Sequence, residues 1–155
     1  MIKRNILLLG LLVFLCVGCD SGRVFESDYD FEEQSWNMDN IPSFQFVVDD
    51  TAPKDIILKI RNSLDFPFRN CYMTYTLMDS VGNTLKTELV NVVLFDETTG
   101  KPFGKGNSVF QHAETILTDY NFPQPGSYNL SVAQYMRKTD LIGTYSIGVR
   151  VEESN

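Results

Sequence analysis

Hydrophobic and polar residues alternate in short runs from Ser43 to near the C-terminus, which is the period of β-strands that bury one face. Five segments show this alternation: Phe44 to Val48, Ile56 to Ile60, Cys71 to Leu77, Tyr128 to Val132 and Tyr145 to Val151. A weaker segment lies at Glu114 to Leu117. Turn residues at 79–83 separate the run at 71–78 from the next run at 84–94, and this arrangement predicts a hairpin.

About seven short strands with turn signals between them, and no run of helical period, predict an all-β chain. We expect an antiparallel β-sandwich of immunoglobulin-like type over residues 41–155. No pair of core cysteines flanks a tryptophan, so an antibody-type domain is excluded.

The first residues have the pattern of a secretory signal. Lys3 and Arg4 precede an uncharged, largely apolar stretch at 5–17. About 20 apolar residues are needed to span a hydrocarbon core, so this stretch is too short for an ordinary transmembrane helix. We expect residues 1–18 to be removed as a lipoprotein signal peptide.

Gly18 and Cys19 follow the apolar stretch, and polar residues come directly after them. This pattern resembles a lipobox, in which a small residue precedes a cysteine that is acylated and becomes the N-terminus after cleavage. Cys16 occupies the position three residues before the cut, where Leu, Val or Ile is usual. We expect Cys19 to be the lipidation site; the alternative is an ordinary signal peptide with an incidental cysteine.

Residues 19–40 are acidic and polar and show no sustained period. We expect this segment to be a tether that becomes ordered near Trp36 and holds the folded domain clear of the membrane.

Removal of Cys16 and acylation of Cys19 would leave Cys71 as the only thiol, so no internal disulfide could form. The alternation places Cys71 on the same face as Met73 and Tyr75. A buried, apolar cysteine is favoured over a reactive thiol, because no neighbouring base is apparent.

The chain has 13 Lys and Arg against 20 Asp and Glu, a net charge of −7. Loss of Lys3 and Arg4 would leave 11 against 20. Nucleic acid and anionic lipid head groups would be repelled, which excludes nucleic acid as a partner. Membrane attachment would then come from the N-terminal lipid.

Few residues suggest catalysis. His112 is the only histidine, and no HExxH or CxxC spacing occurs, so a zinc site is not expected. Ser108, His112 and Asp119 could act as nucleophile, base and orienting carboxylate, but no nucleophile-elbow sequence surrounds Ser108. We expect His112 to be a surface histidine in a loop.

Two further stretches could in principle hold a ligand. The glycines of 100–106 suggest a phosphate loop, but the spacing of a P-loop and its following Lys-Ser/Thr are absent, which favours a plain connection. Calcium could bind to four carboxylates, those of Asp28, Asp30, Glu32 and Glu33. The EF-hand pattern is missing, however, and a solvated acidic tether is favoured. We expect no cofactor and no metal.

Several short motifs follow one another in a distinctive order. They are Trp36 before the first strong strand, Asp49-Asp50, Arg61-Asn62 with the segment from Asp65 to Phe68 and Asn70, Phe103 to Gly106, Phe122-Pro123 with Pro125 to Tyr128, and Gln134 to Lys138. Together with Cys19, this set resembles the gliding motility lipoprotein GldH family of the Bacteroidetes.

The resemblance implies a non-enzymatic lipoprotein of the cell envelope, at the outer membrane, needed for gliding and linked to the type IX secretion machinery. The implied partners are other envelope proteins of that machinery. Only Cys19, as the lipidation site, is carried over from the family, which offers no catalytic residue. The alternative is a surface carbohydrate-binding lipoprotein of a glycan-uptake system, suggested by the fold and by an aromatic content of 12%.

Overall fold

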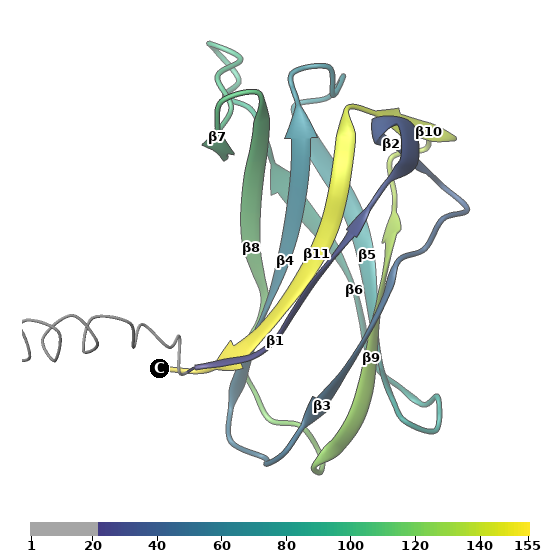
Figure 1. The fold of residues 1–155 in the computed structure, drawn as a ribbon, viewed down its shortest axis with the longest axis vertical. Coiled ribbons are helices and arrows are strands. Elements are labelled where there is room, and N and C mark those ends of the chain that lie inside the picture. The colour runs from purple at the N-terminus through teal and green to yellow at the C-terminus, as the bar shows by residue number, and fades with distance from the viewer. Residues whose placement is uncertain (1–21) are drawn as a thin grey trace, which may run out of the picture.

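The computed structural model describes residues 22–155, and two antiparallel sheets pack as layers in this part of the chain (Figure 1). The predicted signal peptide and Cys19 lie outside the described residues. The first sheet has the order β1 (Arg23–Asp30), β11 (Thr144–Glu153), β4 (Lys54–Ser63), β8 (Val109–Tyr120) and β7 (Lys105–Gly106). The second has the order β3 (Ser43–Val48), β9 (Gly126–Gln134), β5 (Asn70–Asp79) and β6 (Thr84–Val93). β10 (Asp140–Ile142) and β2 (Ser35–Asn37) form a small third sheet, and η2 (Glu32–Gln34) is a single 3₁₀ turn.

The long strands pair in a nested pattern. β1 pairs with β11, β3 with β9, β4 with β8, and β5 with β6, each time antiparallel. The chain thus resembles one long hairpin rolled up so that its successive pairs lie alternately in the two sheets. The predicted all-β antiparallel β-sandwich is confirmed, and its connectivity is that of a jelly roll and not of the expected immunoglobulin-like type, because the strands pair as one rolled-up hairpin.

The core lies between the two sheets and is built by the alternation seen in the sequence. Phe44, Phe46 and Val48 are buried, while Ser43, Gln45 and Val47 between them are exposed. The other predicted runs bury their hydrophobic positions in the same way, and the predicted hairpin of β5 and β6 is confirmed. Each fully buried large side chain stabilises the fold by roughly 1.5–3 kcal/mol.

The predicted tether is wrong for residues 23–37. β1 begins at Arg23 and pairs along its length with β11, and Phe25 packs on Phe46 with ring centroids 5.6 Å apart. Trp36 is fully buried and its indole N–H donates to the Asn40 carbonyl at 2.8 Å. The folded domain therefore begins well before residue 41.

No helix in the described residues is long and apolar enough to cross a membrane.

Candidate functional site

The two outward-facing surfaces of the sandwich differ in charge. The outer face of the five-stranded sheet, called here the charged face, carries Glu26, Asp28, Lys59, Arg150 and other ionised side chains. The outer face of the four-stranded sheet, called here the neutral face, carries none. Its residues are Ser43, Gln45 and Val47 of β3, Ser127, Asn129, Ser131 and Ala133 of β9, Asn70, Tyr72, Thr74, Thr76 and Met78 of β5, and Thr87, Leu89, Asn91 and Val93 of β6.

Polar side chains of the neutral face hydrogen-bond to one another across neighbouring strands. The pairs are Ser43 with Asn129 at 2.7 Å, Gln45 with Ser127 at 3.0 Å, Asn70 with Asn91 at 2.6 Å, and Thr87 with Thr76 at 3.2 Å. These pairs hold the rotamers of the face. It is an uncharged surface on a chain whose net charge is −7.

A hollow of 440 Å³ lies at one end of the neutral face. This aromatic hollow is lined by Phe68, Asn70, Tyr72, Leu89, Tyr135, Met136 and Arg137. Leu89 and Tyr135 are 55% and 59% exposed. Clustered exposed apolar side chains on an ordered surface are typical of interaction sites.

The chain after β9 is held in place beside the hollow. The Tyr135 amide donates to the Tyr72 carbonyl at 2.8 Å, and the Tyr72 amide lies 3.0 Å from Met136 Sδ. The buried amide side chain of Gln134 braces the turn from within, since it donates to the Lys138 carbonyl and accepts from the Met136 amide. Tyr135 and Met136 are therefore fixed against β5 before any partner arrives.

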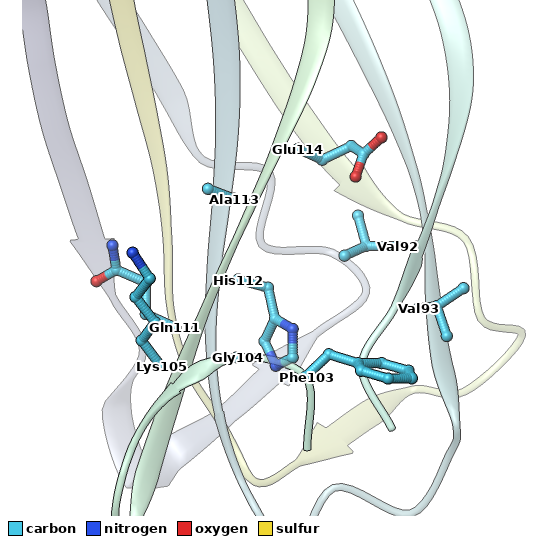
Figure 2. A pocket seen from close by; sticks show the side chains of 9 residues that line it. All are labelled: Val92, Val93, Phe103, Gly104, Lys105, Gln111, His112, Ala113 and Glu114. Carbon is cyan, nitrogen blue, oxygen red and sulfur yellow. The ribbon is translucent and has the colours of Figure 1, made fainter. Parts of the chain in front are cut away.

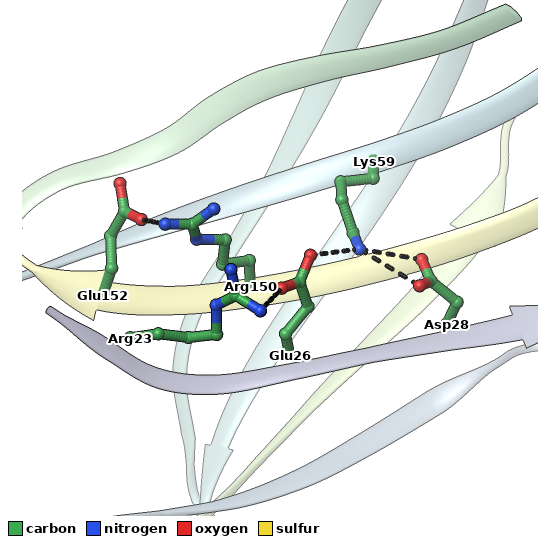
Figure 3. A network of polar contacts seen from close by, with 6 residues as sticks. All are labelled: Arg23, Glu26, Asp28, Lys59, Arg150 and Glu152. Atoms are coloured by element: carbon green, nitrogen blue, oxygen red, sulfur yellow. Dashed lines mark hydrogen bonds and ion pairs between the residues drawn. The ribbon is translucent and has the colours of Figure 1, made fainter. Parts of the chain in front are cut away.

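On the charged face, ion pairs join β1 to β4, which lies on the other side of β11 (Figure 3). Lys59 of β4 is almost fully buried, and its Nζ lies 2.7 Å from Glu26 Oε1 and 2.9 Å from Asp28 Oδ1. The hydrogen bond from Lys59 lowers the pKa of Glu26. Arg23 also pairs with Glu26, and Arg150 pairs with Glu152.

Gly148 of β11 lies between β1 and β4 and leaves space for the Lys59 side chain to pass. A Cβ at this position would stand 1.9 Å from Asp28 Oδ1 and 2.8 Å from Lys59 Cε. The charged network therefore depends on the absence of a side chain here.

A second hollow, of 560 Å³, lies between β6 and β8 and contains His112 (Figure 2). The expected surface position of His112 in a loop is wrong, because the residue lies on β8 and is 7% exposed. Burial lowers the pKa of His112, and its Nε2 has no hydrogen-bond partner in the described residues. A Cβ at Gly104 would stand 2.6 Å from Nε2, so only glycine allows this close approach.

The structure does not bring the candidate catalytic residues together. Asp119 lies near the end of β8 opposite to Ser108, and six residues of extended strand separate it from His112, a distance of roughly 20 Å. The Asp119 backbone amide instead donates a hydrogen bond to Asp55 Oδ1 at 2.9 Å. No nucleophile, base and orienting carboxylate are assembled from this trio.

The residues considered as possible calcium ligands, as a reactive thiol or as a phosphate loop all have structural roles. Asp28 pairs with Lys59 and Asp30 lies 3.9 Å from Arg61, and no group of metal-binding side chains occurs within residues 22–155. Cys71 is buried, as predicted, and burial raises its pKa to about 12. The glycine-rich stretch at 100–106 forms the connection that ends in β7.

Sequence reasoning missed the neutral face, although its signal was readable. The polar positions of the predicted strands are all uncharged in β3, β5 and β9, whereas Lys59 and Arg61 occupy such positions in β4. The aromatic hollow could not be found in this way, because Tyr72 and Tyr135 meet only through the pairing of β5 with β9.

Comparison with known proteins decides the family. The model of the GldH lipoprotein family matches residues 23–151, beginning at the first residue of β1. The chain belongs to the GldH lipoprotein family. The resemblance predicted from the motifs is thereby confirmed, and membership in the GldH family implies a membrane-anchored lipoprotein of the cell envelope.

Individual relatives agree with the GldH match. The gliding motility lipoprotein GldH homolog of Christiangramia forsetii is 25% identical over 154 residues, which cover 92% of this chain and 91% of that protein. The gliding motility lipoprotein GldH of Flavobacterium johnsoniae is 24% identical over 167 residues, covering 99% of both chains. Among solved structures, the VP2 subviral particle of infectious bursal disease virus matches with a TM-score of 0.45 and 17% identity, over 87% of this chain and 33% of that one. A match at that level carries no information on function.

Proposed function

We propose that this chain is a lipid-anchored, non-enzymatic component of the gliding motility and type IX secretion machinery that acts by binding another envelope protein. The neutral face carries the proposal. The cores of protein interfaces are depleted of charged residues, and this surface has none on a chain that is otherwise rich in acidic groups.

The anchor in this proposal is the lipid on Cys19, at the outer membrane. Only three residues separate Cys19 from Arg23, where β1 begins, so the two residues lie at most about 14 Å apart. The start of β1 would therefore sit close to the bilayer, without the long tether expected from the sequence.

This anchoring would point the aromatic hollow away from the membrane. Arg23 pairs with Glu152, which pairs with Asp55 at the beginning of β4. The hollow lies beyond the other end of β4, where β5 begins. A partner protein could reach it without contacting lipid.

Binding is favoured over catalysis by the arrangement of the polar groups. His112, the only histidine, is buried against Gly104 and is far from Asp119 along β8. On the opposite face, Lys59 is occupied in ion pairs that join β4 to β1, and Arg150 is occupied in an ion pair with Glu152 on its own strand.

A second candidate is a neutral glycan as the ligand of the same surface. It is supported by the exposed rings of Tyr72 and Tyr135 beside the amides of Asn70 and Asn91, since sugars stack on aromatic rings and hydrogen-bond to amides. The single cation of the hollow, Arg137, and the apolar side chains of Leu89 and Met136 favour protein instead.

The proposal is tested in the source organism by replacing the gene with a deletion, the wild type, or the Cys19→Ala variant at native expression. Colony spreading and the profile of secreted proteins are measured. We expect the deletion and the Cys19→Ala variant to lose spreading or cargo secretion, and the wild type to restore them. Unchanged spreading and an unchanged secretome in the deletion strain would refute the proposal.

A further inference from the structure

We infer that the aromatic hollow binds a protein segment that presents a large apolar side chain next to a carboxylate, and that Arg137 receives the carboxylate. The inference rests on the proposed function in one respect, that the partner is a protein. It adds the place of binding and the chemistry that is recognised.

The lining of the hollow has the composition of an interface hot spot. Tyr, Phe, Met and Arg are enriched in interface cores, and Lys, Asp and Glu are depleted. The hollow contains Tyr72, Tyr135, Phe68, Met136 and Arg137, and none of its lining residues is Lys, Asp or Glu. An apolar side chain that enters between Leu89 and the two tyrosines would be removed from water on both of its sides.

Arg137 is the only charged residue that lines the hollow. Within the described part of the chain, no carboxylate forms an ion pair with Arg137, while Arg23, Lys54, Lys59 and Arg69 all have such partners. A guanidinium binds a carboxylate through two parallel hydrogen bonds, which gives direction as well as affinity. A carboxylate of the bound segment would therefore complete the ion pair that Arg137 does not form within the described residues.

The negative charge of the rest of the molecule favours binding of an acidic segment near Arg137 over binding elsewhere. An acidic segment is repelled by a chain of net charge −7, and least so where the surface is neutral. The neutral face provides that approach, and Arg137 lies at its end with exposed Lys138 beside it.

The hollow is formed before binding. Gln134 hydrogen-bonds to both sides of the turn that carries Tyr135, Met136 and Arg137. Arg137 itself has a left-handed backbone, with φ of 55°, which costs roughly 1–3 kcal/mol for a residue with a side chain. The surrounding contacts thus hold the guanidinium in a set position, which lowers the entropic cost of binding.

The test uses the full chain in detergent micelles and a phage-displayed library of random dodecapeptides. We expect wild-type protein to enrich peptides in which Asp or Glu lies within two positions of a bulky apolar residue. A synthetic peptide of the enriched sequence should lose affinity about tenfold or more on Arg137→Glu and on Leu89→Glu. Lys101→Glu, which reverses an exposed cation outside the hollow, is the matched control and should bind as the wild type does.

Both variants change exposed side chains, and thermal melting checks that they fold. If one fails to fold, the other carries the measurement, because they lie on different segments of the hollow. The inference is overturned if no sequence is enriched, if the enriched sequences lack acidic residues, or if Arg137→Glu leaves affinity unchanged. Binding of a neutral glycan on an array, lost on Leu89→Glu and kept on Arg137→Glu, would assign the hollow to sugar instead. These outcomes do not depend on spreading or secretion, so failure of the inference is distinct from failure of the proposed function.

Discussion

Lys59 of β4 reaches past β11 to Glu26 of β1, and the Nζ–Oε1 distance is 2.7 Å. The two residues lie on strands that are not neighbours in the sheet, because β11 runs between them. Lys59 therefore joins the N-terminal strand, the one nearest to the proposed lipid anchor, to the centre of the charged face.

Replacement of Lys59 by Met should destabilise the fold by about 1–3 kcal/mol. It leaves Glu26 and Asp28 without their main partner, while the aliphatic stem of the side chain is retained. Urea unfolding measures the change. Arg61→Met is the control, since the Arg61 side chain is only partly buried and lies 3.9 Å from Asp30, and it should cost less than about 1 kcal/mol.

Gly148→Ala should destabilise the fold by about 2 kcal/mol or more, because the added methyl group would overlap Asp28 Oδ1 and force the ion pairs apart. Gly22→Ala is the matched control, since a Cβ there would come no closer than 4.0 Å to another atom. Equal melting temperatures for both variants would show that the Gly148 gap is not required.

His112 should make the fold sensitive to mild acid. Burial lowers the pKa of the folded imidazole below its ordinary value of 6.5, so below pH 6.5 the unfolded chain takes up a proton before the folded protein does. The stability that this residue contributes is complete above pH 6.5 and is lost as the pH falls through the lower folded pKa. Melting temperatures at pH 7.5 and 5.5 should differ more for the wild type than for His112→Gln, and an equal difference would contradict the assignment.

Cys71 should resist thiol reagents in the folded protein. Burial raises its pKa from 9.0 to about 12, so at neutral pH the thiolate fraction is about a thousandfold lower than for a free cysteine. Peptide mass spectrometry after iodoacetamide treatment should find Cys71 unmodified in buffer and modified in urea. Rapid modification in buffer would revive the reactive-thiol alternative.

The strands that the sequence predicted are those with strong alternation, such as Phe44 to Val48 and Tyr128 to Val132. β1 escaped prediction although its residues also alternate, because Ser27 interrupts the hydrophobic positions and acidic residues fill the others. β8 was predicted too short because His112 and Glu114 occupy positions on its inner side, where hydrophobic residues were expected.

The order of the strands and the position of the aromatic hollow depend on contacts between distant parts of the chain. The pairing of β1 with β11 joins the two ends of the domain, and no local pattern encodes it. For the same reason the sequence does not reveal Arg137 as a binding residue. It forms part of a hollow only together with Tyr72 and Leu89, which belong to other segments of the chain.

Adding charge to one face at a time tests whether the neutral face binds a partner. Thr87→Glu with Leu89→Glu places two carboxylates on the neutral face at β6, and Ala113→Glu with Thr115→Glu places two on the charged face at β8. All four positions are exposed, so both proteins should fold and reach the membrane in normal amounts. We expect the first double variant to fail to restore spreading or secretion to the deletion strain and the second to restore it; full restoration by the first would show that the neutral face does not bind a partner.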